Sequence, residues 1–576
     1  MLKNSKIIFY VAVAIFMVGC AYTPKPLNVG QHQKLLHEDR LKAQSNIEST
    51  GPVLTLNEAV ARGLKYNLDH RSKLLEQAIA LGTYDVSKYD MLPRVVAQAG
   101  YNYRNNYFIT DSKDPNTGES RTGSFASSAK DYGHAGLTLN WSLLDFGVGY
   151  LNARQNADRI VVASERRRRT MHILVQDVQS AYLRAAAAQA LKKEIEAAMA
   201  QASAAIGDAQ KVEVSGLRPP LDALKYQKTL LDNVKILSTI EQELSTAKLE
   251  LNQLINLPVI ATPLLEDPEM LAVPNAFLDT AAEDFEVRAM LANTDLKQSI
   301  YEARIAVEEA RKSLLKLFPD LTFSTGAQYS SNSYYVNKSW MESSAGISYN
   351  LWNLLKIPAV KELAEQSKEY AAQRRIMMQM AIVTQVHLSK IQLANSRSQY
   401  QQASQIDDVD ERIAKITTEK YREGVASQAE KVSADVSSIV SHLRKYQALS
   451  QLFAARGKMQ ATTGLEPQFS SLDEIPLDTL TSLVADSFKD WNAGKLPVMP
   501  DQEEPTIGDL RVRDMSLKLP EEPVDPNQSP EDKAVEATLA EKSAEKNQVK
   551  KDWLDIALGI LLKPQQKTAP KNSTQP

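Results

Sequence analysis

The sequence predicts a mixed membrane protein in which two tandem repeats combine long α-helices with short, two-faced β-strands. Three observations lead to this fold class: an internal repeat at a constant offset, four segments in which apolar and polar residues alternate, and long proline-free segments rich in helix-forming residues. The 576 residues are too many for one simple core but suit two related units with appendages. The formal net charge of −3 gives no general electrostatic case for a nucleic-acid partner.

The internal repeat appears when the sequence is shifted by 226 residues. The aligned pairs include Arg62 with Arg288, Asn67 with Asn293, Asp69 with Asp295, Pro93 with Pro319, Gly100 with Gly326 and Tyr103 with Tyr329. Because the offset stays constant through a predicted helix and the strand that follows it, the match indicates an internal duplication. We place the first repeat at residues 53–265 and the second at residues 276–466.

Four predicted strands supply the two-faced segments. They are expected at about residues 94–108 and 132–142 in the first repeat, and at about 320–331 and 341–352 in the second. Each is about ten residues long, which is the length that a tilted strand needs to cross a bilayer. The sequence therefore predicts strands of membrane-spanning length.

The first strand illustrates the pattern. Its odd-numbered positions carry Val95, Ala97, Ala99, Tyr101 and Tyr103, and its even-numbered positions carry Gln98, Gly100, Asn102 and Arg104. A soluble sheet with one face in water is the alternative. The polar faces of the four strands carry mostly Ser, Thr, Asn, Gln and Gly, and aromatic residues recur on the apolar faces, which favours a barrel. We expect the odd-numbered side chains of the first strand to face lipid and the even-numbered ones the pore.

Four strands cannot close a barrel, and open sheet edges are not tolerated in lipid. Two chains would supply eight strands, the size at which side chains fill the interior of a barrel. Three chains would supply twelve strands and a water-filled bore. Geometry therefore favours an oligomer, and a trimer is the smallest that conducts.

Long helices are expected between the strands. There is no proline between Pro115 and Pro219, nor between Pro358 and Pro467, and both stretches are rich in strong helix formers. Residues 148–211 could form one helix of roughly 95 Å. Each long helix is expected to turn back at a glycine, because glycine readily adopts the left-handed conformation that ends a helix.

The N-terminus has the pattern of a secretory signal. Lys3 and Lys6 precede a short apolar stretch that ends at Gly19-Cys20, too short to span a membrane. Residues 17–20 read MVGC and resemble a bacterial lipobox, which implies that Cys20 is lipidated after removal of residues 1–19. An ordinary signal peptide with a chance cysteine is the alternative. Ala21, rather than aspartate, implies an outer-membrane destination, and residues 20–52 would then form a lipid-anchored linker.

Three motifs, in order, resemble the TolC family of outer-membrane channel-tunnels. They are LTLNEAVARGLKYNLDHR (54–71), SLLDFGVGYLNARQ (142–155) and EKYREGVASQAE (419–430). The resemblance covers about residues 50–465, with one departure at Glu213, where the family usually has an aromatic residue. It implies a homotrimer with a twelve-stranded outer-membrane β-barrel, continuous with a long α-helical barrel in the periplasm. With the lipobox, it also implies a protein of the lipoprotein type, anchored in outer-membrane lipid.

The resemblance further implies partners and site residues. The helical tips would dock on a periplasmic adaptor protein that is coupled to an inner-membrane pump of the RND or ABC type. The docking candidates are Gly216, Leu217 and Asp222 at the first tip, and Gly424, Val425 and Glu430 at the second. In the alternative interpretation the glycines only make the turns.

Asp407 and Asp410 lie three residues apart on the helix before the second tip. Repeated around a three-fold axis, they would form rings of carboxylates in a narrowing tunnel and favour cations. A solvated helix face is the alternative interpretation of this charge run.

No pattern in the sequence indicates an enzyme. Asp145-Phe146-Gly147 lacks the other kinase motifs, and the seven histidines show no metal-ligand spacing. We expect no catalytic residues, no metal site and no cofactor. Residues 467–576 are expected to form a largely disordered periplasmic extension.

The predicted function is a passive exit duct for a tripartite efflux system or for type I secretion, and the cargo is not encoded in any recognisable motif. A periplasmic adaptor-like protein or a structural coiled-coil lipoprotein is the alternative. Neither would need four strands of membrane-spanning length.

Overall fold

The computed structural model describes residues 26–45, 47–110, 116–119, 125–215, 220–258, 261–271, 277–278, 280–467, 472 and 475–495. All of them belong to one compact unit within Met1–Val512. The predicted signal peptide (1–19), Cys20 and the tail beyond residue 495 lie outside the described residues.

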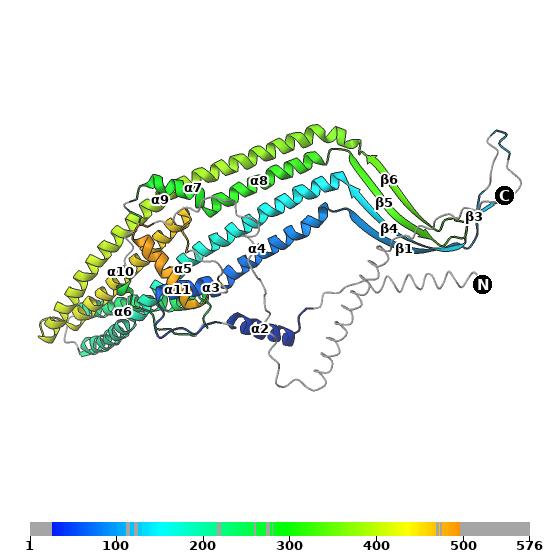
Figure 1. Ribbon diagram of the computed structural model, residues 1–576. Helices are drawn as coiled ribbons and strands as arrows, with labels where there is room; N and C mark the ends of the chain where they lie inside the picture. Colours follow the sequence, from blue (N-terminus) through cyan, green and yellow to red (C-terminus); the bar gives the residue numbers. More distant parts are fainter. Residues whose placement is uncertain are drawn as a thin grey trace. The chain divides into compact units, whose positions relative to one another are not determined.

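A four-stranded antiparallel sheet is formed by the predicted strands (Figure 1). Its strands are β1 (Arg94–Tyr103), β4 (Asp131–Ser142), β5 (Asp320–Ser330) and β6 (Ser339–Ser348), in the order β1-β4-β5-β6. Each repeat thus contributes one antiparallel pair, and the pairing of β4 with β5 joins the two repeats. Both halves of the duplication enter a single sheet.

The strand register groups the side chains as the alternation predicts. One row across the sheet contains Ala97, Leu137, Ala327 and Met341, and the adjacent row on the opposite face contains Gln98, Gly136, Gln328 and Trp340. Apart from Trp340, the second row is polar or small. The odd-numbered residues of all four strands therefore share one largely apolar face.

Two of the four predicted strands end earlier in the structure than predicted. The first strand ends at Tyr103 rather than at residue 108, and Phe108–Thr110 (β2) pairs instead with Phe125–Ser128 (β3) as a separate ribbon. The fourth strand ends at Ser348 rather than at residue 352. The Asn350 side chain accepts a hydrogen bond from the Trp352 backbone (3.1 Å), so the chain is already in the turn that precedes the next helix.

Four helices lie side by side in the same order as the strands (Figure 1). They are α4 (Leu68–Ser87), α5 (Leu143–Ser215), α8 (Thr294–Leu315) and α9 (Trp352–Arg422). The 73 residues of α5 include the whole predicted segment 148–211 and span about 110 Å. Each of these helices adjoins one strand in sequence, so the sheet and the helical layer are continuous.

The remaining helices pack around the long ones. They are α2 (Val29–Gln44), α3 (Leu56–Tyr66), α6 (Pro220–Leu254), α7 (Ala282–Ala292), α10 (Gln428–Thr463) and α11 (Leu477–Asn492), with short 3-10 turns η1 (Lys88–Met91) and η2 (Pro268–Met270). The most extensive helix contacts are those of α10 with α9 and of α6 with α5. Among the described residues, no helix has both the length and the apolar character needed to cross a membrane.

The main hydrophobic core lies where α3, α5, α10 and α11 meet. Helix α11 contributes Leu477, Leu480, Val484, Phe488 and Trp491 to it. The region after residue 467, expected to be largely disordered, therefore includes a folded helix, because one face of this segment is apolar at helical spacing.

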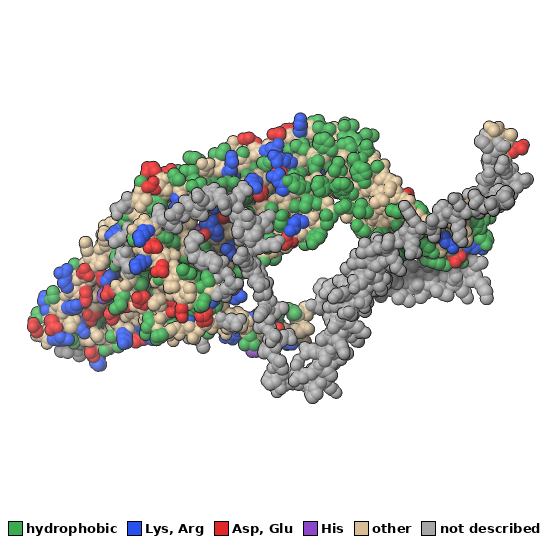
Figure 2. Space-filling model, in the orientation of Figure 1, with side chains coloured by type: hydrophobic (Ala, Val, Ile, Leu, Met, Phe, Trp, Pro, Cys, Tyr) green, Lys and Arg blue, Asp and Glu red, His purple; other side chains and the backbone are tan. Residues whose placement is uncertain are grey.

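Large apolar side chains remain exposed where α9 meets the sheet. Figure 2 shows hydrophobic side chains gathered over this part of the molecule. They include Leu351, Trp352, Leu354, Leu355 and Leu363, all more than half exposed. An exposed apolar patch of this kind marks an interface with lipid or with another protein surface.

Candidate functional site

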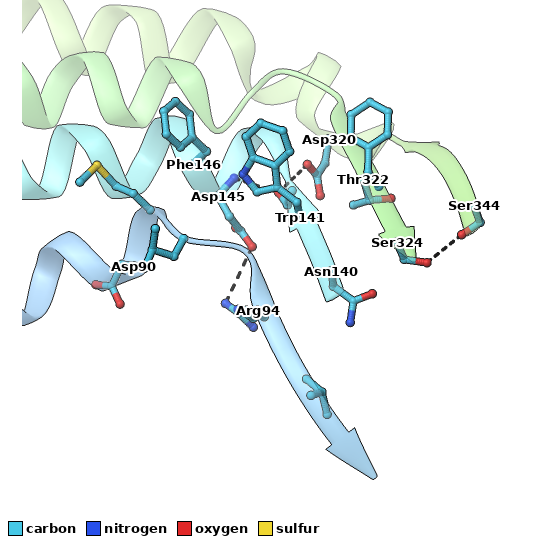
Figure 3. Close-up of a pocket in the computed structure, with 15 residues that line it drawn as sticks. Asp90, Arg94, Asn140, Trp141, Asp145, Phe146, Asp320, Thr322, Ser324 and Ser344 are labelled. Carbon is cyan, nitrogen blue, oxygen red and sulfur yellow. Dashed lines mark hydrogen bonds and ion pairs between the residues drawn. The ribbon is translucent and has the colours of Figure 1, made fainter. Parts of the chain in front are cut away.

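The junction between sheet and helices forms an open pocket (Figure 3). The Asp320 carboxylate accepts a hydrogen bond from the Ser142 hydroxyl (2.7 Å), and Ser142 Oγ in turn accepts one from the Asp145 backbone (2.9 Å). Arg94 lies 3.8 Å from the Asp145 carboxylate, and both side chains are exposed. These polar groups hold the turn from β4 into α5 against the first residue of β5.

Aromatic side chains lie beside these polar groups at the same end of the sheet. Trp141 packs edge-on against Phe146, with 6.1 Å between ring centroids, and its ring lies 6.4 Å from that of Phe323. At the other end of the sheet, Tyr101 and Tyr103 on β1 are 68% and 72% exposed. Aromatic residues at both ends of an apolar strand face are typical of sheets that cross a bilayer.

The second helix tip is described completely. Gly424 has φ +74°, the left-handed conformation that glycine adopts without a steric penalty. The backbone amides of Val425 and Ala426 both donate to the Lys420 carbonyl, at 2.8 and 3.1 Å. A Cβ atom at Gly424 would meet no atom within 4 Å, and Val425 is 73% exposed. The tip therefore offers an uncovered surface on a fixed turn.

Glu430 belongs to the structure of this turn. Ser427 caps α10, and the Glu430 carboxylate accepts hydrogen bonds from the Ser427 backbone (2.7 Å) and hydroxyl (2.9 Å). The hydrogen bond from the Ser427 backbone lowers the pKa of Glu430. This is a capping box, and its Ser-x-x-Glu spacing was present in the sequence without being recognised.

The first helix tip is described only in part. Gly216 and Leu217 lie outside the described residues. Asp222 lies in α6, but its side chain is also outside the described part of the structure. The docking candidates of the first tip stay predictions.

The two aspartates before the second tip have different environments. The Asp407 side chain is only 3% exposed and pairs with Lys445 (3.1 Å) and His442 (3.3 Å) on α10, whereas Asp410 is partly exposed. Burial acts to lower the pKa of Lys445, but its hydrogen bonds to Glu269 and Asp407 outweigh this and raise it. Two carboxylates were expected to be available for a ring of charge. Only that of Asp410 is available, because the Asp407 carboxylate is paired with side chains of its own chain.

Sequence reasoning missed these partners of Asp407, which lie 35 and 38 residues further along the chain. It also missed a buried network in which Glu466 accepts hydrogen bonds from Arg168 (2.8 Å) and His172 (3.1 Å). Within the described residues, no cluster of three His, Cys, Asp or Glu side chains has the arrangement of a metal site.

Comparison with known proteins gives a consistent result. Residues 64–257 match the model of the outer membrane efflux protein family. No match was found among curated proteins.

Several solved channels have a similar fold. The CmeC outer membrane channel of Campylobacter jejuni is similar with a TM-score of 0.57 and 12% identity, over 82% of this chain and 98% of that one. The outer-membrane channel OprN is similar with a TM-score of 0.54 and 14% identity, over 71% of this chain and 89% of that one. The outer membrane protein VceC from Vibrio cholerae is similar with a TM-score of 0.51 and 14% identity, over 71% of this chain and 97% of that one.

The family match covers α4, α5 and α6 of the first repeat, and the structural similarity extends over both repeats. Residues 64–257 thus match the outer membrane efflux protein family, and the chain has the fold of the solved outer-membrane channels.

Proposed function

We propose that three copies of this chain form a passive outer-membrane duct, a twelve-stranded β-barrel continuous with an α-helical tunnel in the periplasm. The observation that carries the proposal is the four-stranded sheet with two open edges and one exposed apolar face. Its cargo leaves through the bore, and the energy comes from a pump at the inner membrane.

The open edges are the first argument. Within the part of the chain that the structure describes, β1 and β6 each pair along one side only. Unpaired backbone groups cost several kcal/mol each in lipid, so a sheet in a bilayer must close on itself. Three copies of four strands give twelve, with β1 of one chain beside β6 of the next.

The helical layer supports the same closure. Its two outer helices, α4 and α9, carry apolar side chains that the chain itself leaves exposed. They include Leu75, Ile79 and Val86 on α4, and Leu363, Met377 and Met380 on α9. Because α4 adjoins β1 in sequence and α9 adjoins β6, the closure that joins the strands also brings these two helices together. Burial of such surface contributes about 25 cal/mol per Å².

The second tip is the proposed docking surface for a periplasmic adaptor, which the RND- or ABC-type pump would engage. Gly424 and Val425 form its exposed turn, and Glu430 acts by holding that turn through the capping box. Gly216, Leu217 and Asp222 are proposed for the first tip. Asp410 remains a candidate for a ring of charge in the tunnel. Cys20 is proposed as the lipid anchor in the outer membrane.

Conductance in planar bilayers tests the duct. Purified protein should form an oligomer of three chains and give discrete, stable conductance steps. A protein that binds membranes only through its lipid and never conducts would refute the duct and favour the adaptor-like or scaffold alternative.

Substitution at Gly424 tests the docking surface separately. Gly424→Trp should abolish cross-linking to the adaptor while the trimer still assembles, because a Cβ here meets no atom of its own chain within 4 Å and the indole would stand where the partner docks. Gly424→Asn is the matched control, since asparagine tolerates the left-handed conformation. Cross-linking that survives Gly424→Trp would remove the tip from the proposal and leave the duct intact.

A further inference from the structure

Two helical hairpins form the end of the molecule that carries the helix tips (Figure 1). The first hairpin consists of α5 and α6, and the second consists of α9 and α10. Among the described helices, α10 supplies the main packing between the hairpins, chiefly against α5 and to a smaller extent against α6. A group that changes the contact of α10 with α5 therefore changes how firmly the two hairpins are held together.

His442 on α10 lies in this contact, between carboxylates on two other helices. Its Nε2 atom is 3.3 Å from Asp407 Oδ1 on α9, and its Nδ1 atom is 3.8 Å from Glu194 Oε2 on α5. The side chain of His442 is 18% exposed, that of Asp407 is 3% exposed, and that of Glu194 is 54% exposed. One imidazole ring thus faces a carboxylate of its own hairpin on one side and a carboxylate of the other hairpin on the other side.

The hydrogen bonds around this ring are incomplete. The buried atoms His442 Nδ1 and Asp407 Oδ1 have no hydrogen-bond partner among the described residues. A neutral imidazole has one N–H group, so it can donate to only one of two carboxylates and presents a lone pair to the other. A protonated imidazole has two N–H groups and can donate to both. The two flanking carboxylates therefore match the protonated ring.

The charges around the ring favour the same protonation state. Lys445, one helical turn after His442, contacts Asp407 (3.1 Å) and Glu269 of η2 (3.0 Å). Together with Glu194, these groups amount to three carboxylates and one ammonium group. The excess of negative charge attracts a proton to the imidazole, because nearby opposite charge favours the charged form of a titratable group.

The other charged or titratable neighbours do not reverse this balance. Glu411 on α9 also lies near the imidazole, and it pairs with Lys415 (2.6 Å). The ring of Tyr446 stacks beside the imidazole, with 6.5 Å between centroids, and burial raises the pKa of its phenol to about 12, so it is neutral. On α6, Glu243 approaches α10 but accepts a hydrogen bond from Gln447 (2.9 Å).

We propose that His442 is an acid-operated clamp between the two hairpins. Histidine is the side chain whose charge ordinarily changes between about pH 5 and pH 8. In the upper part of this range the ring is neutral and adds nothing to the contact with Glu194. In the lower part the protonated ring pairs with Asp407 on α9 and with Glu194 on α5, and holds α10 against α5. The hairpins are then joined more firmly in acid than at neutral pH.

Hydrogen exchange of the full-length protein tests the clamp. At pH 5.5, the amides of α10 around residue 442 should exchange about two- to fivefold more slowly in the unsubstituted protein than in His442→Gln. At pH 8 the two proteins should exchange equally. Comparison at the same pH removes the intrinsic pH dependence of exchange. The variant should fold, because glutamine is polar and the position is partly exposed.

Substitution of Glu194 identifies the partner on the other hairpin. In Glu194→Gln, the amides of α5 around residue 194 should lose the slower exchange at pH 5.5. The amides of α10 should keep part of it, because Asp407 still pairs with the protonated ring. Slower exchange of α5 that persists in Glu194→Gln would contradict a clamp between the hairpins.

His387→Gln is the matched control. His387 on α9 also contacts a carboxylate, that of Glu286 on α7 (2.6 Å), but it lies outside the contact of α10 with α5. This variant should keep the acid effect on α5 and α10. The same pH profile in His442→Gln and the unsubstituted protein, or an equal loss in His387→Gln, would overturn the proposal.

The consequence for conduction rests on the proposed duct. In planar bilayers, a change from pH 8 to pH 5.5 should lower the conductance of the unsubstituted protein more than that of His442→Gln. His442→Arg keeps its positive charge and should conduct at pH 8 as the unsubstituted protein does at pH 5.5. A protein that never conducts would refute the duct and leave the exchange result standing. Exchange that is insensitive to His442 would refute the clamp and leave the duct intact.

Discussion

The two repeats begin with the same local device. Asn67 in the first and Asn293 in the second each cap a helix, accepting a hydrogen bond from the backbone amide three residues on at 3.0 Å. Each asparagine also donates at 3.0 Å to a distant carbonyl, that of Leu254 near the end of α6 and that of Thr462 near the end of α10. Each repeat is therefore closed on its own last helix by one duplicated side chain.

The helices before these asparagines differ in burial. In α3, eight of eleven residues are buried, but in α7 only three of eleven are. The difference follows from α11, which packs on α3 and makes no comparable contact with α7. Arg62 is also fully buried, and its guanidinium donates to the carbonyls of Glu48 and Ser49 in the segment before α3, whereas Arg288 is half-buried. Both repeats therefore keep the break between two helices at the asparagine. Helix α11, which belongs to neither repeat, changes the environment of the helix before the first break.

The largest expected effect tests the role of α11. Leu480 is fully buried in the core, so Leu480→Ala should lower the free energy of unfolding by about 2–5 kcal/mol. Hydrogen exchange should become faster in α3 and stay unchanged in α7. Ser482→Ala, at an exposed position of α11, is the control. Equal acceleration in α3 and α7 would mean that α11 does not create the difference between the repeats.

The strands give the next largest effect and should behave alike in both repeats. Ala97 on β1 and Ala327 on β5 lie in one row of the apolar face. Arginine at either position should destabilise the proposed barrel by about 2–4 kcal/mol if the row lies at mid-membrane. Gln98→Arg and Gln328→Arg, on the opposite face, should cost much less. Urea denaturation in lipid vesicles measures all four, and equal costs on both faces would contradict the assignment of the faces.

The paired asparagines test the shared device itself. Asn67→Ala and Asn293→Ala should each cost about 1–2 kcal/mol, because each removes a helix cap and leaves a carbonyl without its donor. The two costs should agree closely, since the hydrogen-bond distances are the same. Urea denaturation of the single and double variants provides the values. A several-fold difference would show that burial by α11, and not the cap, dominates at Asn67.

How much the sequence predicted depended on the range of the interactions involved. Alternation along the strands and the constant offset of Asn67 and Asn293 are local or repeated signals, and they predicted the strands and the duplication. The end of β6 was missed because the apolar alternation continues to Leu351, beyond Ser348, the last residue that pairs with β5. The environment of Asp407 was missed because Lys445 and His442 lie on another helix, and no spacing rule joins them.

The smallest expected effect concerns the contact between the repeats at Glu466. This residue follows α10 of the second repeat, and its carboxylate pairs with Arg168 and His172 on α5 of the first. Burial acts to raise the pKa of Glu466, but the hydrogen bond from His172 and the charge of Arg168 outweigh it and lower the pKa. The carboxylate is therefore held in its charged form between the repeats.

A lowered carboxylate pKa fixes the sign of the pH dependence. Its contribution to stability is fully present above the unfolded-state pKa of about 4.3 and is lost as the pH falls through the folded-state pKa, because the unfolded chain binds the proton first. Unfolding measured from pH 6 to pH 3 should thus show a loss of stability that is reduced in Glu466→Gln and unchanged in Glu423→Gln, at an exposed tip position. An identical acid profile in Glu466→Gln and the unsubstituted protein would mean that this contact does not join the two repeats energetically, and that the pairing of β4 with β5 does so instead.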